Sequence, residues 1–137
     1  IDISVTYAKD RTQFGKPIGS YQAVKHLLAT AQVRIEFARP VVHAAAAELP
    51  LGTPAAMARA AHAKYAAGEA ADLAARTAVQ VHGAMGMTWE ADVHFFLKRI
   101  VALRHAWGGP AVQMAQVIGR IDEQPTGPDR TFACAMK

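Results

Sequence analysis

The stretch that decides the fold is Arg11-Thr12-Gln13-Phe14-Gly15-Lys16-Pro17-Ile18-Gly19, which interrupts a chain otherwise rich in helical patterns. A second stretch, Gln80-Val81-His82-Gly83-Ala84-Met85-Gly86, also combines polar anchors with glycines. The chain between them is long enough for two long antiparallel helices, which would return it to the end of the bundle where it started. Both stretches are therefore predicted to be loops at one end of a helical bundle.

The residue types in these loops suit a phosphate-bearing or heterocyclic ligand. Arg11 offers a forked cation that matches a pair of phosphate oxygens. Gln13, Gln22 and Gln80 offer amide donors and acceptors. Gly83 lets the backbone take a positive φ or approach a ligand closely. We therefore expect a ligand of this kind at one end of a helical domain.

The fold class follows from the spacing of the apolar residues. Helical periodicity extends over about residues 1–10, 20–49, 54–82, 89–107 and 110–121, and no segment alternates as a strand would. These segments predict an all-α, antiparallel up-down helical bundle with a short last helix. The core face of the second segment is expected to consist of Val24, Leu27, Leu28, Ala31, Ile35, Ala38, Val42 and Ala46.

Several residues are predicted to begin or bend these helices. Ser20, Thr53 and Thr88 each precede a helical segment and can act as N-caps. Pro54 suits the first helical position after Thr53. Pro40 lies inside the second segment, where its missing backbone N–H predicts a kink.

Composition places the chain among globular proteins. It is 52% hydrophobic and 19% charged, with a net charge of +4. The positive charge is consistent with anionic partners or simply with a mildly basic surface. No cluster of Lys and Arg and no row of aromatic side chains indicates nucleic-acid binding. No apolar run is long enough to predict a membrane span.

The cysteine content and the two ends of the chain lead to further expectations. Cys134 is the only cysteine, so no internal disulfide can form and no zinc-binding spacing exists. This indicates a reducing, cytoplasmic compartment and no metal site. Residues 1–121 are expected to form the bundle, and residues 122–137 a disordered tail. Residues 1–10 resemble the end of a helix, so we expect the chain to be part of a longer polypeptide.

Beyond these patterns, the chain resembles the C-terminal helical domain of the acyl-CoA dehydrogenases, flavoproteins that desaturate acyl-CoA thioesters between Cα and Cβ. The resemblance covers roughly residues 1–121. It rests on the stretch from Tyr7 to Ile18, Tyr21-Gln22, the stretch from Ala78 to Gly86, Thr88-Trp89-Glu90 and Lys98-Arg99.

The resemblance implies FAD as the cofactor, held mainly by a neighbouring subunit and completed by loops of this domain. The residues that would contact FAD are Arg11, Gln13, Phe14, Gln22, Gln80, Val81 and Gly83. Arg11 would face the pyrophosphate, and Phe14 would pack on the adenosine side. Ala84 replaces a glycine that is usual in the family, so a small displacement of the second loop is expected there.

The catalytic residue stays unassigned. The family often carries its base, a glutamate, in a Glu-Gly-Thr element before the last helix, but the corresponding residues here are about Trp107-Gly108-Gly109-Pro110. Pro110-Ala111-Val112 replaces a Thr-Ser-Gln that touches flavin in relatives. Glu90 is the nearest acid to the second loop, but its position better suits a helix N-terminus. The base is therefore expected upstream of Ile1, unless this is the non-catalytic half of a mixed-subunit enzyme.

Two functions remain open from the sequence. One is the C-terminal domain of an FAD-dependent acyl-CoA dehydrogenase, with an acyl-CoA substrate, an electron-transfer acceptor and a homo- or hetero-oligomer formed through the bundle. The other is a non-catalytic assembly subunit of a heteromeric enzyme. His82-Gly83 followed by Thr88-Trp89-Glu90 resembles the actinobacterial branch of the family, which acts on bulky acyl-CoAs, including those of sterols.

Overall fold

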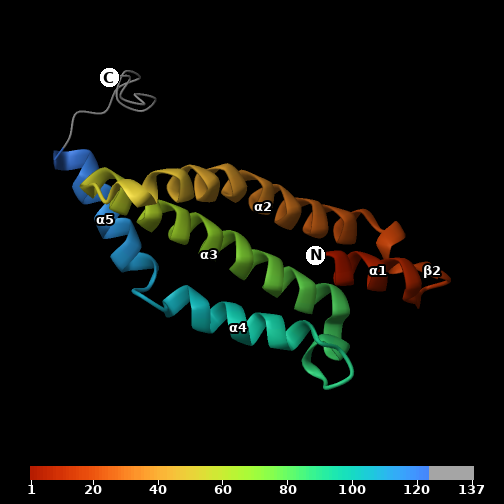
Figure 1. Ribbon diagram of the computed structural model, residues 1–137. Coiled ribbons are helices and arrows are strands. Elements are labelled where there is room, and N and C mark those ends of the chain that lie inside the picture. Colours follow the sequence, from red (N-terminus) through yellow and green to blue (C-terminus); the bar gives the residue numbers. More distant parts are fainter. Residues whose placement is uncertain (124–137) are drawn as a thin grey trace.

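The computed structural model describes residues 1–123, which form helices joined by short turns (Figure 1). The α-helices are α1 (Asp2–Asp10), α2 (Gln22–Glu48), α3 (Pro54–His82), α4 (Val93–His105) and α5 (Pro110–Glu123). The 3-10 helices are η1 (Ile18–Ser20), η2 (Leu49–Leu51) and η3 (Gly83–Met87). A hairpin is formed by the two-residue strands β1 (Thr12–Gln13) and β2 (Lys16–Pro17). The predicted all-α class is confirmed.

The centre of the bundle is the antiparallel pair α2 and α3, which lie side by side over most of their length (Figure 1). Their buried residues include two rows with a seven-residue spacing, namely Ala31, Ala38 and Ala45 on α2 and Ala56, Ala63, Ala70 and Thr77 on α3. A seven-residue spacing returns to the same helix face after two turns. Small side chains on that face allow the helix axes to approach closely.

The predicted core face of α2 is only partly buried. Ala31 and Ala38 are buried as predicted, whereas Leu27 and Val42 are 42% and 39% exposed. The third buried alanine of the row is Ala45, and Ala46 is exposed. The prediction fails at these positions because helices that meet through small alanine side chains share only a narrow strip of contact. Larger side chains on either side of that strip lie outside the interface.

The start of α3 agrees with the sequence prediction. The N–H of Ala56 donates to Thr53 Oγ1 at 3.1 Å, and Pro54 occupies the first helical turn. A cap of this kind stabilises a helix by about 1 kcal/mol. The preceding helix, α2, contains Pro40 and continues through it to Glu48. Pro40 therefore does not divide α2 into two helices.

The two other predicted caps are wrong. Ser20 Oγ donates to the carbonyl of Pro17 at 2.7 Å, and α2 begins only after Tyr21. Thr88 Oγ1 likewise donates to the carbonyl of Met85 at 2.9 Å, and α4 begins at Val93 instead of Trp89. Both hydroxyl groups close the turn before them, a local bond that competes with capping the following helix.

Charged side chains fasten α4 along the outer side of α3. Arg104 of α4 forms an ion pair with Glu69, and its Nη1 lies 3.5 Å from Asp72 Oδ2. Lys64 of α3 donates to the carbonyls of Leu103 and Arg104 at 3.3 and 3.2 Å. A cation at the last turn of a helix satisfies carbonyls that have no partner within the helix.

The last helix, α5, packs against α3 near the end of the bundle opposite the hairpin (Figure 1). Residues 122–137 were predicted to be a disordered tail, but α5 extends to Glu123, so Asp122 and Glu123 are helical. The remainder of that predicted tail, residues 124–137, lies outside the described residues. Within residues 1–123, no helix is both long and apolar enough to cross a membrane.

Candidate functional site

The first predicted loop is a tight hairpin between α1 and α2. Thr12 pairs with Pro17 and Gln13 with Lys16. The two residues at the tip, Phe14 and Gly15, have φ values of 52° and 79°, the signature of a type I′ turn. Glycine adopts this conformation freely, whereas phenylalanine is strained in it.

Phe14 is therefore both strained and exposed. Its side chain is 92% exposed, so packing within the described chain does not explain its presence. A residue held in a sparsely populated backbone region costs about 1–3 kcal/mol and is most common at functional sites. The tip of the hairpin is thus a candidate contact for a ligand or a neighbouring subunit.

Arg11 stands at the base of the hairpin with a fixed backbone and an exposed side chain. Its N–H donates to the carbonyl of Tyr7 at 2.8 Å, and its carbonyl accepts from the N–H of Ile18 at 2.8 Å. Its guanidinium forms no ion pair or side-chain hydrogen bond with residues 1–123. Five N–H donors are therefore available to an anion.

The hairpin also contacts the start of α2. The hydroxyl of Tyr21 donates to the carbonyl of Gln13 at 3.3 Å, and Lys16 Nζ lies 4.2 Å from the centre of the Tyr21 ring. Gln22 follows as the first residue of α2, and its side chain is exposed. Four of the predicted residues therefore lie on the hairpin or directly beside it, namely Arg11, Gln13, Phe14 and Gln22.

The second predicted loop is η3, which turns sharply after α3. Gly83 has φ 61° and ψ −138°, a conformation that favours glycine. At Gly86, a Cβ atom would lie 2.9 Å from the carbonyl oxygen of Val79, so the close return of the chain also requires glycine. Gln80 is exposed, whereas the side chain of Val81 is buried. Val81 can therefore reach a ligand only through its backbone.

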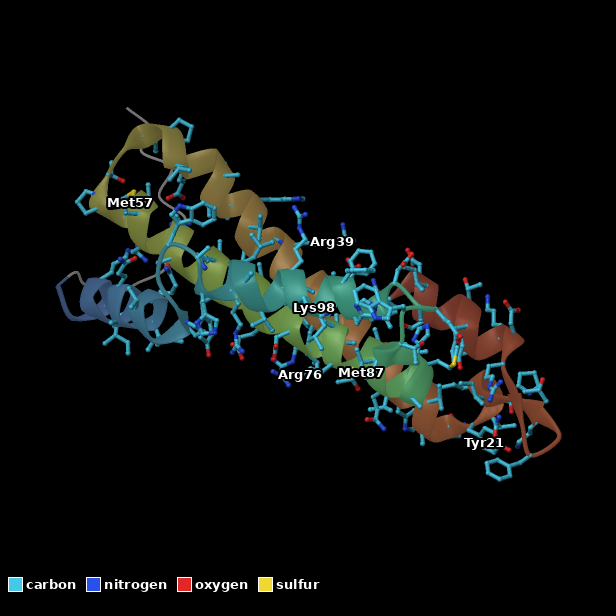
Figure 2. All side chains as sticks on the ribbon, turned by 90° about the horizontal axis from the view of Figure 1, so that it is seen from below. Tyr21, Arg39, Met57, Arg76, Met87 and Lys98 are labelled. Atoms are coloured by element: carbon cyan, nitrogen blue, oxygen red, sulfur yellow. The ribbon has the colours of Figure 1, made fainter. Side chains whose placement is uncertain are left out.

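The two loops share one end of the bundle, as predicted (Figure 1). Figure 2 shows that Tyr21, at the start of α2, lies farther out along the bundle than Met87, at the end of η3. The rings of Tyr7 and His82 stack between α1 and α3 with centroids 4.2 Å apart. Since Tyr7 precedes Arg11 by one helical turn and His82 adjoins Gly83, this stack connects the two loops.

Sequence reasoning missed Tyr7 and His82 as functional candidates, although both lie in the quoted motifs. A signal was present, because an aromatic side chain one helical turn before a candidate ligand residue lies above it on the same helix face. The contact between these rings depends on the packing of α1 against α3, which the sequence alone does not specify.

Comparisons with known proteins agree with this architecture. The family model for the C-terminal domain of acyl-CoA dehydrogenases matches residues 1–121. The chain belongs to the acyl-CoA dehydrogenase family. Acyl-CoA dehydrogenase IpdE2 of Mycolicibacterium smegmatis is 42% identical over 117 residues, covering 85% of this chain and 36% of the relative. The chain thus spans about a third of that relative's length.

Solved structures show the same fold. The ChsE4-ChsE5 complex from Mycobacterium tuberculosis contains a chain that matches with a TM-score of 0.83 and 30% identity, covering 91% of this chain and 34% of the other. The FAD complex of PigA matches with a TM-score of 0.80 and 26% identity, covering 88% and 31% respectively. In each of these two proteins, the matching domain makes up about a third of the chain.

The α4–α5 turn of this acyl-CoA dehydrogenase domain contains a second strained aromatic residue. Trp107 has φ 54° and is 85% exposed, and Gly108 follows with φ 97°. The buried side chain of Gln113 donates to the carbonyls of Trp107 and Gly108 at 2.9 and 3.3 Å. This turn carries no carboxylate, so no side chain in it can act as a base.

The acid nearest the second loop in the sequence is Glu90. Glu90 is exposed and lies in the turn before α4, three residues ahead of the first helical residue, Val93. Its predicted place in the first turn of that helix is therefore wrong. Among residues 1–123, no three His, Cys, Asp or Glu side chains gather as a potential metal site.

Proposed function

We propose that this C-terminal domain completes the FAD site of an acyl-CoA dehydrogenase and contributes the helical bundle to its oligomer. The observation that carries the proposal is the exposed hairpin at one end of the bundle. There, the free guanidinium of Arg11 lies close in the chain to the exposed ring of Phe14, whose backbone has a positive φ. The glycine-rich η3 loop occupies the same end (Figure 1).

The residues of these loops fit the chemical groups of FAD. The guanidinium of Arg11 can donate two parallel hydrogen bonds to a pyrophosphate. The exposed ring of Phe14 offers an apolar face to the adenosine side, and Gln13 and Gln22 offer amide groups. Gln80 through its side chain, and Val81 and Gly83 through their backbone, would contact the cofactor from the second loop.

The contribution of this chain to the reaction is positioning. When bound, FAD would accept the hydride equivalent that leaves Cβ of an acyl-CoA thioester. Arg11 and the two loops would hold the cofactor in a fixed orientation, which lowers the entropic part of the barrier. The carboxylate that removes the α-proton would come from another part of the protein, since the α4–α5 turn has none.

The substrate, electron acceptor and subunit assembly of the whole protein are proposed from its relatives. An acyl-CoA thioester as substrate, an electron-transfer acceptor and a homo- or hetero-oligomer are the partners that we propose. The chain of the ChsE4-ChsE5 complex supports an assembly of subunits, and the sole cysteine, Cys134, supports a cytoplasmic location. The resemblance to the actinobacterial branch supports a role in fatty acid or sterol degradation.

The structure of the α4–α5 turn favours a second candidate, a non-catalytic subunit of a heteromeric acyl-CoA dehydrogenase. Trp107 occupies approximately the place at which many family members carry the base, and Gln113 holds the turn in its strained form. A chain retained for assembly alone would keep the bundle and lose the flavin contacts. The intact Arg11, Gln13 and Phe14 set favours the first candidate.

The two candidates differ in whether the protein holds flavin through Arg11. The natural full-length protein, purified without added flavin, is expected to show a flavin absorbance spectrum. After flavin removal, Arg11→Ala should weaken FAD binding about 10- to 100-fold, since hydrogen bonds to charged groups contribute about 1.5–3 kcal/mol. Binding of FMN, which lacks the adenylate part, should change much less.

A matched control separates this effect from a general loss of charge. Arg39 is exposed on α2 and pairs with Glu36 at 3.1 Å, well away from the hairpin (Figure 2). Arg39→Ala should leave the FAD affinity unchanged. A colourless protein whose FAD affinity does not respond to Arg11→Ala would reject the first candidate and support an assembly subunit.

A further inference from the structure

The stack between Tyr7 and His82 lies where both candidate loops begin. The ring centroids are 4.2 Å apart with an interplanar angle of 23°. Tyr7 is in the last turn of α1, and its carbonyl accepts the N–H of Arg11 at 2.8 Å. His82 is the last residue of α3, directly before Gly83. The stack therefore contacts the segment leading into each loop without belonging to either loop.

His82 is held rigidly in this contact. It is 5% exposed, and its Nδ1 lies 2.8 Å from the carbonyl oxygen of Ala78, which requires a proton on Nδ1. A Cβ atom at Gly86 would come within 3.1 Å of the Cβ of His82, so η3 folds back tightly over this residue. The histidine ring thus provides a fixed surface between α3 and η3 against which Tyr7 packs.

We propose that Tyr7 and His82 are positioning residues that set the spacing between the Arg11 hairpin and the Gly83 loop. This inference rests on the proposed function, because the spacing matters only if one ligand spans both loops. The two residues would not touch the ligand themselves. They would orient α1 on α3, and through it the backbone from which Arg11 projects.

The proposal follows from how the hairpin is anchored. Arg11 follows α1 directly, and α1 is a nine-residue helix that packs against α3. Loss of the stack would let α1 pivot on α3 and carry Arg11 with it. Binding constellations tolerate deviations of only about 0.5 Å. A ligand spanning the loops would then bind less tightly although every contact residue were still present.

Substitutions that keep or remove the rings test this role in the natural full-length protein after its flavin has been removed. Tyr7→Leu and His82→Leu should each weaken FAD binding about tenfold, measured by quenching of flavin fluorescence. Tyr7→Phe keeps the aromatic stack and loses only the long hydrogen bond of 3.5 Å from the Tyr7 hydroxyl to the carbonyl of His82, so it should stay within about threefold of the unaltered protein. Tyr65→Leu makes the same change on a half-buried tyrosine elsewhere on α3 and should have no effect.

The decisive measurement is a double-mutant cycle with Arg11→Ala. If Tyr7 acts by placing Arg11, then Arg11→Ala should weaken FAD binding much less in the Tyr7→Leu protein than in the unaltered protein. Hydrogen exchange of residues 11–18 in the flavin-free protein should also become faster in Tyr7→Leu. If Tyr7→Leu does not fold, His82→Leu provides the same cycle.

Three results would overturn the proposal. The two effects could add independently, Tyr7→Phe could bind FAD as weakly as Tyr7→Leu, or Tyr65→Leu could weaken FAD binding equally. The proposed function fails separately, if Arg11→Ala leaves FAD affinity unchanged in the unaltered protein. In that case, faster exchange of residues 11–18 in Tyr7→Leu would show a purely structural stack, which also rejects a positioning role.

Discussion

The side-chain amide of Gln113 donates to the carbonyl of Trp107 at 2.9 Å and so secures a backbone conformation that tryptophan seldom adopts. Trp107 has a positive φ and an exposed ring, whereas Gln113 is 5% exposed. The same amide reaches the carbonyl of Gly108 at 3.3 Å. A buried side chain on α5 thus offsets strain in the turn that precedes it and fixes the direction in which Trp107 projects.

Removal of this amide should destabilise the turn. Gln113→Met keeps most of the side-chain volume but loses both donated hydrogen bonds, and we expect the free energy of unfolding to fall by about 1–3 kcal/mol. Urea unfolding followed by tryptophan fluorescence measures this change. Gln116→Met, on the exposed side of α5, is the control and should change stability by less than about 0.5 kcal/mol. Equal effects of the two substitutions would show that the bonds to the turn contribute nothing.

Two glycine-to-alanine substitutions should have opposite signs. At Gly86 an added Cβ would lie 2.9 Å from Val79 O and 3.2 Å from Val79 Cα, so Gly86→Ala should destabilise the protein by about 1–3 kcal/mol. At Gly119, inside α5, nothing lies within 4 Å of the added atom. Gly119→Ala should therefore stabilise the protein by about 0.5–1 kcal/mol, since alanine favours helices. Thermal unfolding of both variants tests the prediction, and a neutral Gly86→Ala would contradict the close packing of η3.

Arg104 and Arg76 should differ in their contribution to stability although both pair with Asp72. Arg104 is 24% exposed and joins α4 to α3, so Arg104→Leu should lower the free energy of unfolding by about 1–3 kcal/mol. Arg76 is 63% exposed, so Arg76→Gln should change the free energy of unfolding much less than Arg104→Leu does, measured for both variants by urea unfolding.

The pH dependence of the Arg76–Asp72 ion pair follows from the direction in which the pKa of Arg76 is shifted. The hydrogen bond that Arg76 donates to Asp72, and the negative charge of Asp72, raise the pKa of Arg76 above its usual value. A group whose pKa is raised by folding contributes its full stabilisation at pH values below its pKa in the unfolded chain. That stabilisation is lost only as the pH rises through its pKa in the folded protein. Because both values lie far above neutral pH, the Arg76→Gln difference in urea unfolding should be constant around neutrality. A difference that changed there would contradict this assignment.

Much of the fold could be predicted because helical periodicity and turn residues pointed to the same boundaries. The Thr53 cap, the end of α3 at His82 and the turn before Pro110 were all predicted correctly. The caps at Ser20 and Thr88 failed, because a hydroxyl can bond backward into a turn as readily as forward into a helix. The sequence does not distinguish these two partners.

Features of the candidate site that depend on neighbouring residues in the sequence could be predicted, whereas features that depend on the folded chain could not. Loop positions and residue types at Arg11 and Gly83 were visible in the motifs, since glycine and proline interrupt the helical pattern there. The strain at Phe14 was not visible, because it depends on the hairpin register that places this residue at the tip. The stack of Tyr7 on His82 depends on residues 75 positions apart and on how α1 packs.

Phe14 is expected to lower the stability of the protein and to strengthen its binding of FAD. Phe14→Asn creates an Asn-Gly pair, the favoured sequence of a type I′ turn, and should raise the free energy of unfolding by about 1 kcal/mol. The same change removes the exposed ring and should weaken FAD binding, measured by fluorescence titration of the flavin-free protein. The control is Phe37→Asn, because Phe37 is 72% exposed in the middle of α2. Asparagine is a poor helix former, so Phe37→Asn should lower stability slightly and leave FAD affinity unchanged. A Phe14→Asn protein that is less stable would contradict the strain at the hairpin tip, and one with undiminished FAD affinity would show that the ring serves a purpose other than cofactor binding.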